Sequence, residues 1–230
     1  MKTIGMLGGM SWESSVVYER IINEEVRRRL GGSRSASLII RSYDFGEIQS
    51  YQERGAWAEA GELLASDARR LVDAGADVII LCTNTMHQVA GSIERAVGSA
   101  FIHIADATAA AIQSANIRRV GLLGTRYTME RDFYKERLSL AHGLDVVIPR
   151  EDDRATVHRV IFDELVRGVI DTDSREEFRA IAGRLVAEGA SGIIAGCTEI
   201  ELLLRPEDVP VAYFPTTRLH ALAAVDAALD

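Results

Sequence analysis

The sequence predicts an α/β fold built from two similar halves, each with a parallel sheet. Short apolar segments alternate with longer helical segments, the order typical of parallel strands joined by right-handed crossovers. Residues 68–85 and 182–199 align without a gap at a constant offset of 114, with eight identities in eighteen positions. Residues 4–8 resemble residues 120–124 at an offset of 116. Two such internal similarities, in the same order along the chain, favour duplication of a whole unit. The alternative is that any α/β chain carries several strand–glycine–helix segments.

Eight segments are predicted strands, and several are continuous apolar runs, as expected for strands that are covered on both faces. They are Thr3–Leu7, Ser37–Ser42, Val78–Cys82, Ala100–His103, Val120–Leu123, Val146–Ile148, Gly192–Ala195 and Val211–Phe214. The predicted helices are Ser14–Leu30, Trp57–Ala74, Ala107–Ala115, Thr128–Ala141, Arg154–Val169, Arg175–Glu188 and Thr217–Leu229. We expect residues 1–98 and 211–230 to form the first domain and residues 99–210 the second, because the last strand and helix should return to the first half.

Composition and charge exclude several classes of protein. The 230 residues carry a net charge of −8, which argues against a nucleic-acid partner, since phosphates require clustered positive charge. No apolar run is long enough for a membrane span, so we expect no membrane partner. The apolar start, Met1–Leu7, is too short for a signal peptide, and we expect a cytoplasmic protein.

The sequence also argues against common cofactors. The two cysteines, Cys82 and Cys197, lie too far apart in the sequence to indicate a metal site, and a disulfide is improbable inside a cell. A pyridoxal phosphate enzyme needs a lysine for its Schiff base. The chain has only Lys2, at the start of the first strand, and Lys135, in an exposed-looking helix. We therefore expect no cofactor and no metal.

Cys197 directly follows a predicted buried strand, in the segment Gly196-Cys197-Thr198-Glu199. Ligands bind beyond the carboxyl ends of the strands in such folds. A thiol at the N-terminus of a helix has a lowered pKa, so we expect Cys197 to carry a raised thiolate fraction. The alternative is an inert buried cysteine. The polar pair that follows Cys197 favours a functional pocket.

Thr83 occupies the position of Cys197 in the other copy of the repeat, and Cys82 precedes it. Adjacent residues on a strand point to opposite faces, so only one of the two can face a site. The repeat places Thr83 at the site and Cys82 in the packed core. A dyad of Cys82 with His87 would require an irregular turn. His87 either orients this loop, which we favour, or acts as a ligand.

Two turns at predicted strand ends offer hydrogen-bond donors to a small anion. The turn Gly8–Glu13 follows the first strand, but its glycines do not match G-x-G-x-x-G, so dinucleotide binding is only weakly indicated. Its free backbone amides suit a carboxylate. The alternative is a tight turn in which Ser11 caps a helix. After the third strand, Asn84 and Thr85 offer further donors.

Together these segments resemble the aspartate/glutamate racemase family over essentially the whole chain. The resemblance rests on residues 4–14 (IGMLGGMSWES), 84–87 (NTMH), 103–106 (HIAD) and 196–199 (GCTE). It implies two similar doubly wound domains with parallel sheets, related by pseudo-two-fold symmetry, with the active site in the cleft between them. It also implies a homodimer and a cofactor-independent isomerase that acts on a small amino acid.

The resemblance further implies two-base proton transfer at the substrate Cα, by one cysteine from each half. The family's first cysteine directly precedes Asn-Thr, and here that residue is Thr83. We therefore expect Cys197 to be the strong base and Thr83, directly or through water, the weak opposite partner. L-to-D conversion should then dominate. The expected substrate-binding residues are Met10, Ser11, Gln52, Asn84, Thr85, Thr198 and Glu199.

Two departures from the family pattern bear on the substrate side chain. The family's late Phe-Asp-Thr is Phe214-Pro215-Thr216 here, and a lysine often found near residue 165 is replaced by Val166, with Arg167 adjacent. Gln52 and Arg54 lie either on a loop that closes over the site and contacts a distal carboxylate, or at a solvated helix start. The roles of Arg54, Arg126 and Arg167 stay open. Aspartate or glutamate is the expected substrate.

Two other functions remain open from the sequence. A single functional cysteine would also suit a decarboxylase or cis–trans isomerase that acts on a small dicarboxylate. Thr83 would suit a binding protein that has kept the pocket but lost turnover. Exchange of the substrate α-proton discriminates between a racemase and a binding protein.

Overall fold

The computed structural model describes residues 1–230 and divides into two compact units. Unit 1 comprises Met1–Ile104 and Thr217–Asp230, and unit 2 comprises Ala105–Thr216. None of the helices is both long and apolar enough to cross a membrane. Each unit contains one four-stranded sheet in which all strands are parallel. The predicted α/β fold class with two similar parallel sheets is therefore confirmed.

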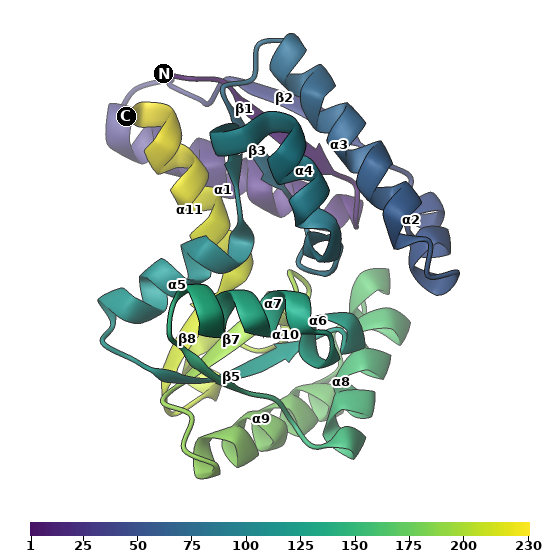
Figure 1. Ribbon diagram of the computed structural model, residues 1–230. Coiled ribbons are helices and arrows are strands. Elements are labelled where there is room, and N and C mark those ends of the chain that lie inside the picture. The colour runs from purple at the N-terminus through teal and green to yellow at the C-terminus, as the bar shows by residue number, and fades with distance from the viewer. The chain divides into compact units, whose positions relative to one another are not determined.

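Unit 1 is built on a sheet with the strand order β2-β1-β3-β4 (Figure 1). Its strands are β1 (Ile4–Gly8), β2 (Leu38–Ser42), β3 (Val78–Leu81) and β4 (Phe101–Ile102). Its helices are α1 (Trp12–Leu30), α2 (Phe45–Glu53), α3 (Trp57–Asp73), α4 (Ala90–Val97) and α11 (Thr216–Leu229), with short 3-10 helices η1 (Thr85–Val89) and η2 (Gly98–Ala100).

Two hydrophobic clusters cover the two faces of this sheet. Ile79 and Leu81 of β3 point into a cluster formed with α3 and α4. Ile80 and Cys82 point into the opposite cluster, formed with α1 and α11. The alternation of side chains along a strand produces this division. Because both faces are covered, unit 1 is doubly wound, as expected for a strand that is apolar at every position.

Unit 2 repeats this arrangement with the strand order β6-β5-β7-β8. Its strands are β5 (Arg119–Gly124), β6 (Asp145–Val147), β7 (Gly192–Gly196) and β8 (Ala212–Pro215). Its helices are α5 (Ile104–Ser114), α6 (Arg126–Glu130), α7 (Asp132–Glu136), α8 (Glu151–Asp163), α9 (Thr172–Ala187) and α10 (Ile200–Leu203), with a π-helix η3 (Arg137–Ala141) and 3-10 helices η4 (Leu165–Arg167) and η5 (Pro206–Asp208). Figure 1 shows α9 on one face of this sheet and α5 and α7 on the other.

The two sheets share their packing as well as their strand order. A Cβ added to Gly5 of β1 would lie 2.7 Å from Ile79 Cδ1 and 3.3 Å from Leu71 Cβ. A Cβ added to Gly121 of β5 would lie 2.9 Å from Ile193 Cδ1 and 3.1 Å from Leu185 Cβ. These residues are related by the offsets of the sequence repeat. Glycine at both positions lets the equivalent helix, α3 in unit 1 and α9 in unit 2, pack closely against its sheet. This shared packing supports duplication of a whole unit.

The structure corrects three sequence-based expectations about the elements. Residues 128–141 were expected to form one helix, but they form parts of α6, α7 and η3. Gln52, which the sequence left either on a loop or at a helix start, lies near the end of the helix α2, and α4 was not predicted. The expected domain limits also differ from the observed units, because β4 pairs with β3 in the first sheet and β8 pairs with β7 in the second. Of the residues from 211 onward, only those from Thr217 belong to unit 1.

Candidate active site

The nine predicted site residues are all buried although eight of them carry polar groups or a thiol. Each is at most 9% exposed. They are Met10, Ser11, Gln52, Thr83, Asn84 and Thr85 in unit 1, and Cys197, Thr198 and Glu199 in unit 2. Buried polar side chains are uncommon and need hydrogen-bond partners or a ligand. All but Gln52 follow the carboxyl end of β1, β3 or β7, where parallel sheets bind ligands.

Cys197 and Glu199 form a thiol–carboxylate pair directly after β7. The Cys197 thiol donates to Glu199 Oε2 at an S–O distance of 2.9 Å. Burial and the Glu199 carboxylate raise the pKa of the Cys197 thiol well above its usual range, and Glu201 adds to the effect. The predicted lowering of this pKa is therefore wrong. The helix α10 that follows has only four residues, and its dipole is outweighed by two carboxylates in a buried setting.

Cys82 lies in the packed core of unit 1, as the repeat predicts, and Thr83 follows it in a turn. Cys82 continues the ladder by donating its backbone N–H to Leu7 O, and its side chain is fully buried in the cluster with α1 and α11. Burial raises the pKa of this thiol, which keeps it neutral. Thr83 begins a turn in which its N–H donates to Leu81 O at 2.8 Å. The Thr83 hydroxyl makes no hydrogen bond within the protein, so it is available to a ligand.

The turn after β1 approaches β2 so closely that only glycine fits. Gly9 has a φ of +84°, and a Cβ there would lie 2.3 Å from Tyr43 O. The Gly9 N–H donates to Ser15 Oγ at 2.7 Å. Ser11 caps α1 by accepting from Ser14 N, so the capping role that the sequence left open is observed. β1 and β3 are neighbours in the sheet, and this turn and the Thr83 turn therefore lie at the same edge of unit 1.

Gln52 reaches this edge from α2. Its side-chain Nε2 donates to the sulfur of Met86 at 3.2 Å, and Met86 lies in η1, directly after Thr85. Gln52 is therefore packed against the turn that carries Thr83, and it does not lie on an open loop. A contact of this kind, 34 residues apart in the chain, leaves no local pattern in the sequence.

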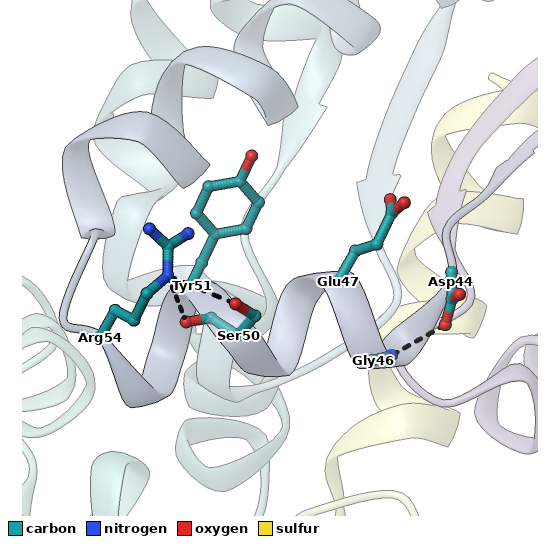
Figure 2. A pocket seen from close by; sticks show the side chains of 6 residues that line it. All are labelled: Asp44, Gly46, Glu47, Ser50, Tyr51 and Arg54. Carbon is teal, nitrogen blue, oxygen red and sulfur yellow. Dashed lines mark hydrogen bonds between the residues drawn. The ribbon is translucent and has the colours of Figure 1, made fainter.

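Arg54 lines a shallow, open depression along α2, which Figure 2 shows from close by. Its Nε donates to Ser50 O and Ser50 Oγ, and its guanidinium lies 5.4 Å from the centre of the Tyr51 ring. Asp44 and Glu47 line the same depression. Two carboxylates against one guanidinium do not favour an acidic ligand. The depression is therefore a poor candidate for binding a distal carboxylate.

Two other arginines have no acidic partner. Arg126 follows the carboxyl end of β5, the strand beside β7, and its side chain is exposed. Its backbone N–H donates to His158 Nδ1 at 3.2 Å. Arg167 ends η4 and is also exposed. Of the two, Arg126 shares a sheet edge with Cys197.

Sequence reasoning missed two groups that hold the site loops. The buried Asp67 of α3 accepts from the Tyr43 hydroxyl at 2.8 Å and from Arg41 Nε at 3.0 Å, which fixes the backbone that Gly9 packs against. Thr216 Oγ1 donates to Ala195 O at 2.8 Å, two residues before Cys197. Asp67 lies on a helix face and gave no signal. Thr216 lies in the segment whose departure from the family pattern was noted, which could have drawn attention to it.

Comparison with known proteins identifies the family. A sequence model of the Asp/Glu/Hydantoin racemase family matches residues 7–224. The chain belongs to this family. Over the full length of both chains it is 50% identical to a candidate Asp/Glu racemase from Yersinia pestis, with a TM-score of 0.95. It is 34% identical, again over both full lengths, to an aspartate racemase homologue from Pyrococcus horikoshii OT3, with a TM-score of 0.85.

More distant members of the racemase group share the fold. A glutamate racemase from Francisella tularensis, solved with D-glutamate, is 14% identical and has a TM-score of 0.67, with 98% of this chain and 80% of that chain covered. Membership of the Asp/Glu/hydantoin racemase family, together with the two similar structures above, identifies the protein as an isomerase of the racemase type. The resemblance inferred from the sequence is confirmed.

Proposed function

We propose that the protein racemises aspartate or glutamate by proton transfer at Cα, with Cys197 and Thr83 as the two acting groups. The observation that carries the proposal is the thiol of Cys197 hydrogen-bonded to Glu199 at the carboxyl end of β7. A thiol in this setting is protonated at rest, and it needs an acceptor for its proton before it can act as a base. Glu199 is that acceptor, since its Oε2 already receives the hydrogen bond.

The proposed reaction from the L-enantiomer has two steps that balance in protons. The Cys197 thiol passes its proton to Glu199, and the thiolate then takes the α-proton, which leaves a carbanion on the substrate. The Thr83 hydroxyl, directly or through a water molecule, gives a proton to the opposite face of Cα. The proton on Glu199 returns to solvent, and solvent restores the proton that Thr83 gave. Cys197 ends as a thiol that carries the former α-proton.

The carbanion requires stabilisation by donors around the substrate carboxylate. Side chains of this kind after the ends of β1, β3 and β7 are Ser11, Asn84, Thr85 and Thr198. We assign the substrate carboxylate to these residues, and we assign packing around the substrate to Met10 and Gln52. The family description and the printed names of the two similar structures support aspartate or glutamate as the substrate.

The proposal predicts an asymmetric enzyme. A thiolate is a far better base than a threonine hydroxyl, whose proton is much less acidic than that of a thiol. Removal of the α-proton by Cys197 should therefore be faster than removal by Thr83 from the other enantiomer. By the geometry of the family the second thiol faces the L-enantiomer, so α-hydrogen exchange should be faster from the L-enantiomer. Because the equilibrium constant between enantiomers is one, kcat/KM must be equal in the two directions. A higher kcat for L-to-D conversion should therefore be matched by a higher KM for the L-enantiomer.

Proton NMR in D₂O tests the proposal directly. The α-hydrogen of L- and D-aspartate and of L- and D-glutamate is followed in separate samples, with chiral chromatography of the same samples. We expect exchange from the L side with accumulation of the D product. Cys197→Ala should reduce the exchange rate by roughly 10²- to 10⁴-fold, the range that a positioned general base contributes.

Either of two results would reject this function. One is the absence of exchange from both enantiomers in a folded sample, which would move the assignment to the dicarboxylate chemistry or the binding protein considered above. The other is exchange that persists in Cys197→Ala.

We also propose that the reaction needs no cofactor and that the protein is a homodimer. Exhaustive dialysis against a chelator should leave the rate unchanged, and light scattering after gel filtration should give twice the chain mass of 25.2 kDa.

A further inference from the structure

Three buried histidines gather in unit 1 next to the Thr83 turn, and the proposed proton transfers use none of them. His87 lies in η1, His103 follows β4, and His220 lies in α11. Each is at most 4% exposed. The ring of His87 lies 4.5 Å from that of His103 and 5.8 Å from that of His220, measured between centroids.

The partners of His87 fix its protonation. Ile104 N–H approaches His87 Nε2 at 3.2 Å, and because a backbone N–H can only donate, Nε2 must carry no proton. The other ring nitrogen, Nδ1, lies 2.7 Å from Thr83 O, a carbonyl that can only accept. Nδ1 therefore carries the proton. His87 is a neutral imidazole in a single tautomer that bridges two backbone groups, a role that neither the other tautomer nor the imidazolium can fill.

His220 binds the same short segment from the other side of His103. Its Nε2 donates to Ile102 O at 2.9 Å, and its Nδ1 lies 2.9 Å from the hydroxyl of Tyr18 on α1. The backbone on either side of His103 is therefore held by two imidazoles. Ile104 is the last residue of unit 1 before the chain enters unit 2.

We propose that His87 is a positioning residue for the proton donor Thr83. Its Nδ1–H holds the Thr83 carbonyl directly, and the Ile104 N–H contributes by keeping the imidazole in the tautomer that can do so. The backbone N–H of Thr83 bonds back to Leu81, and its carbonyl bonds to His87, so both ends of this residue are held while its hydroxyl stays free. This inference rests on the proposed function, in which Thr83 delivers the second proton. It assigns His87 no direct contact with the reacting atoms.

Two amide substitutions separate the two bonds of His87. In His87→Asn the amide nitrogen can occupy the place of Nδ1, which keeps a donor for Thr83 O and loses the acceptor for Ile104. In His87→Gln the amide oxygen can occupy the place of Nε2, which keeps the acceptor and loses the donor. The measured quantity is the ratio of inversion to α-deuterium incorporation from the L-enantiomer. Inversion requires Thr83, whereas incorporation requires only Cys197.

We expect the ratio to fall about tenfold in His87→Gln, the size of effect that one lost buried hydrogen bond can produce, and to fall less in His87→Asn. His142→Asn and His142→Gln in unit 2 are the matched controls, and both should keep the wild-type ratio. An equal fall in both His87 variants, with equal melting temperatures, would overturn the proposal. A change in KM alone, with an unchanged ratio, would also overturn it.

A second measurement does not depend on activity. Long-range ¹H–¹⁵N spectra of the wild type should show His87 as the neutral Nδ1–H tautomer at about pH 7, the pH at which an unperturbed histidine is largely neutral. The amide cross-peaks of Thr83 and Asn84 should move in His87→Gln and less in His87→Asn. An imidazolium or an Nε2–H tautomer would reject the inference. Failure of the proposed function would instead appear as absent exchange in the wild type with the expected tautomer present.

Discussion

The two units share their packing but differ at the ends of equivalent strands. Gly5 with Ile79 in unit 1 and Gly121 with Ile193 in unit 2 form matching contacts at the offsets of the repeat. Directly after β7, however, a thiol bonds to a carboxylate, whereas after β3 the equivalent residue is Thr83 with a free hydroxyl. Packing inside the sheets has thus been kept in both copies, while the residues at the carboxyl edge have diverged.

The partner residues diverge together with the acting groups. Two positions after Cys197 stands Glu199, and two positions after Thr83 stands Thr85. A thiol that must lose its proton gains from a nearby acceptor, whereas a hydroxyl that only donates has no need of one. The residue two positions after each proposed acting group therefore suits the role of that group: a carboxylate follows the thiol of Cys197, and no carboxylate follows the hydroxyl of Thr83. This comparison supports different roles for the two units in the proposed reaction.

Glu199→Gln removes the acceptor and should have the largest effect of the changes that follow. Catalysis should fall by about 10²-fold, because the thiol loses the group that takes its proton. The pKa of Cys197 should fall at the same time, since the Glu199 carboxylate is one of the causes that raise it. Alkylation of Cys197 by iodoacetamide should then reach half its maximal rate at a lower pH than in the wild type. Slower alkylation together with unchanged exchange would contradict the role of Glu199.

Thr83→Cys should make the two edges more alike. A second thiol at this position can remove a proton as well as donate one, so exchange from the D-enantiomer should rise by about tenfold or more. Exchange from the L-enantiomer should change less, because it depends on Cys197. Thr83→Ser is the control, since it keeps a hydroxyl. If the D-side rate does not rise in a folded Thr83→Cys protein, Thr83 is not the opposite partner.

Much of the fold followed from the sequence because its signals are local. The strands are continuous apolar runs that end in glycine or polar residues, and the repeat marks which strands are equivalent. What failed was decided over long distances. The last strand joins the second sheet because β8 pairs with β7, and nothing within residues 211–216 specifies that partner. Helix α4 has only eight residues and follows a 3-10 helix, so its periodic pattern is short.

Some features of the candidate site could likewise be predicted from the sequence, and others could not. The expected core position of Cys82 agrees with the structure, because strand alternation and the repeat specify it locally. The pKa of Cys197 was predicted in the wrong direction, although Glu199 was visible two residues away. The direction of the Glu199 side chain depends on the turn, and the extent of burial depends on the whole fold. Neither can be read from the neighbouring residues.

Gly5→Ala and Gly121→Ala test whether the shared packing is equivalent. Each new methyl group would lie under 3.0 Å from an isoleucine Cδ1, and in both units the residue behind it is a leucine related by the repeat. Overpacking of this kind costs about 1–3 kcal/mol. Denaturant unfolding should show a similar loss for both variants, with Gly5→Ala the larger because its contact is the closer. A loss confined to one variant would show that the two units differ in their cores as well as at their edges.

Cys82→Ala should have the smallest effect and separates the two cysteines. Cys82 is fully buried among apolar side chains, so its loss should cost about 1 kcal/mol of stability, the typical effect of a point mutation, and leave the exchange rate nearly unchanged.

Burial raises the pKa of the folded-state thiol above the unfolded value of about 8.5. The unfolded chain therefore binds fewer protons than the folded chain above that pH, and the contribution of Cys82 to stability is lost as pH rises. The stability difference between the wild type and Cys82→Ala should be constant below about pH 8 and shrink above it. A difference that grows with pH would mean that the thiol ionises more easily in the folded protein than in the unfolded chain.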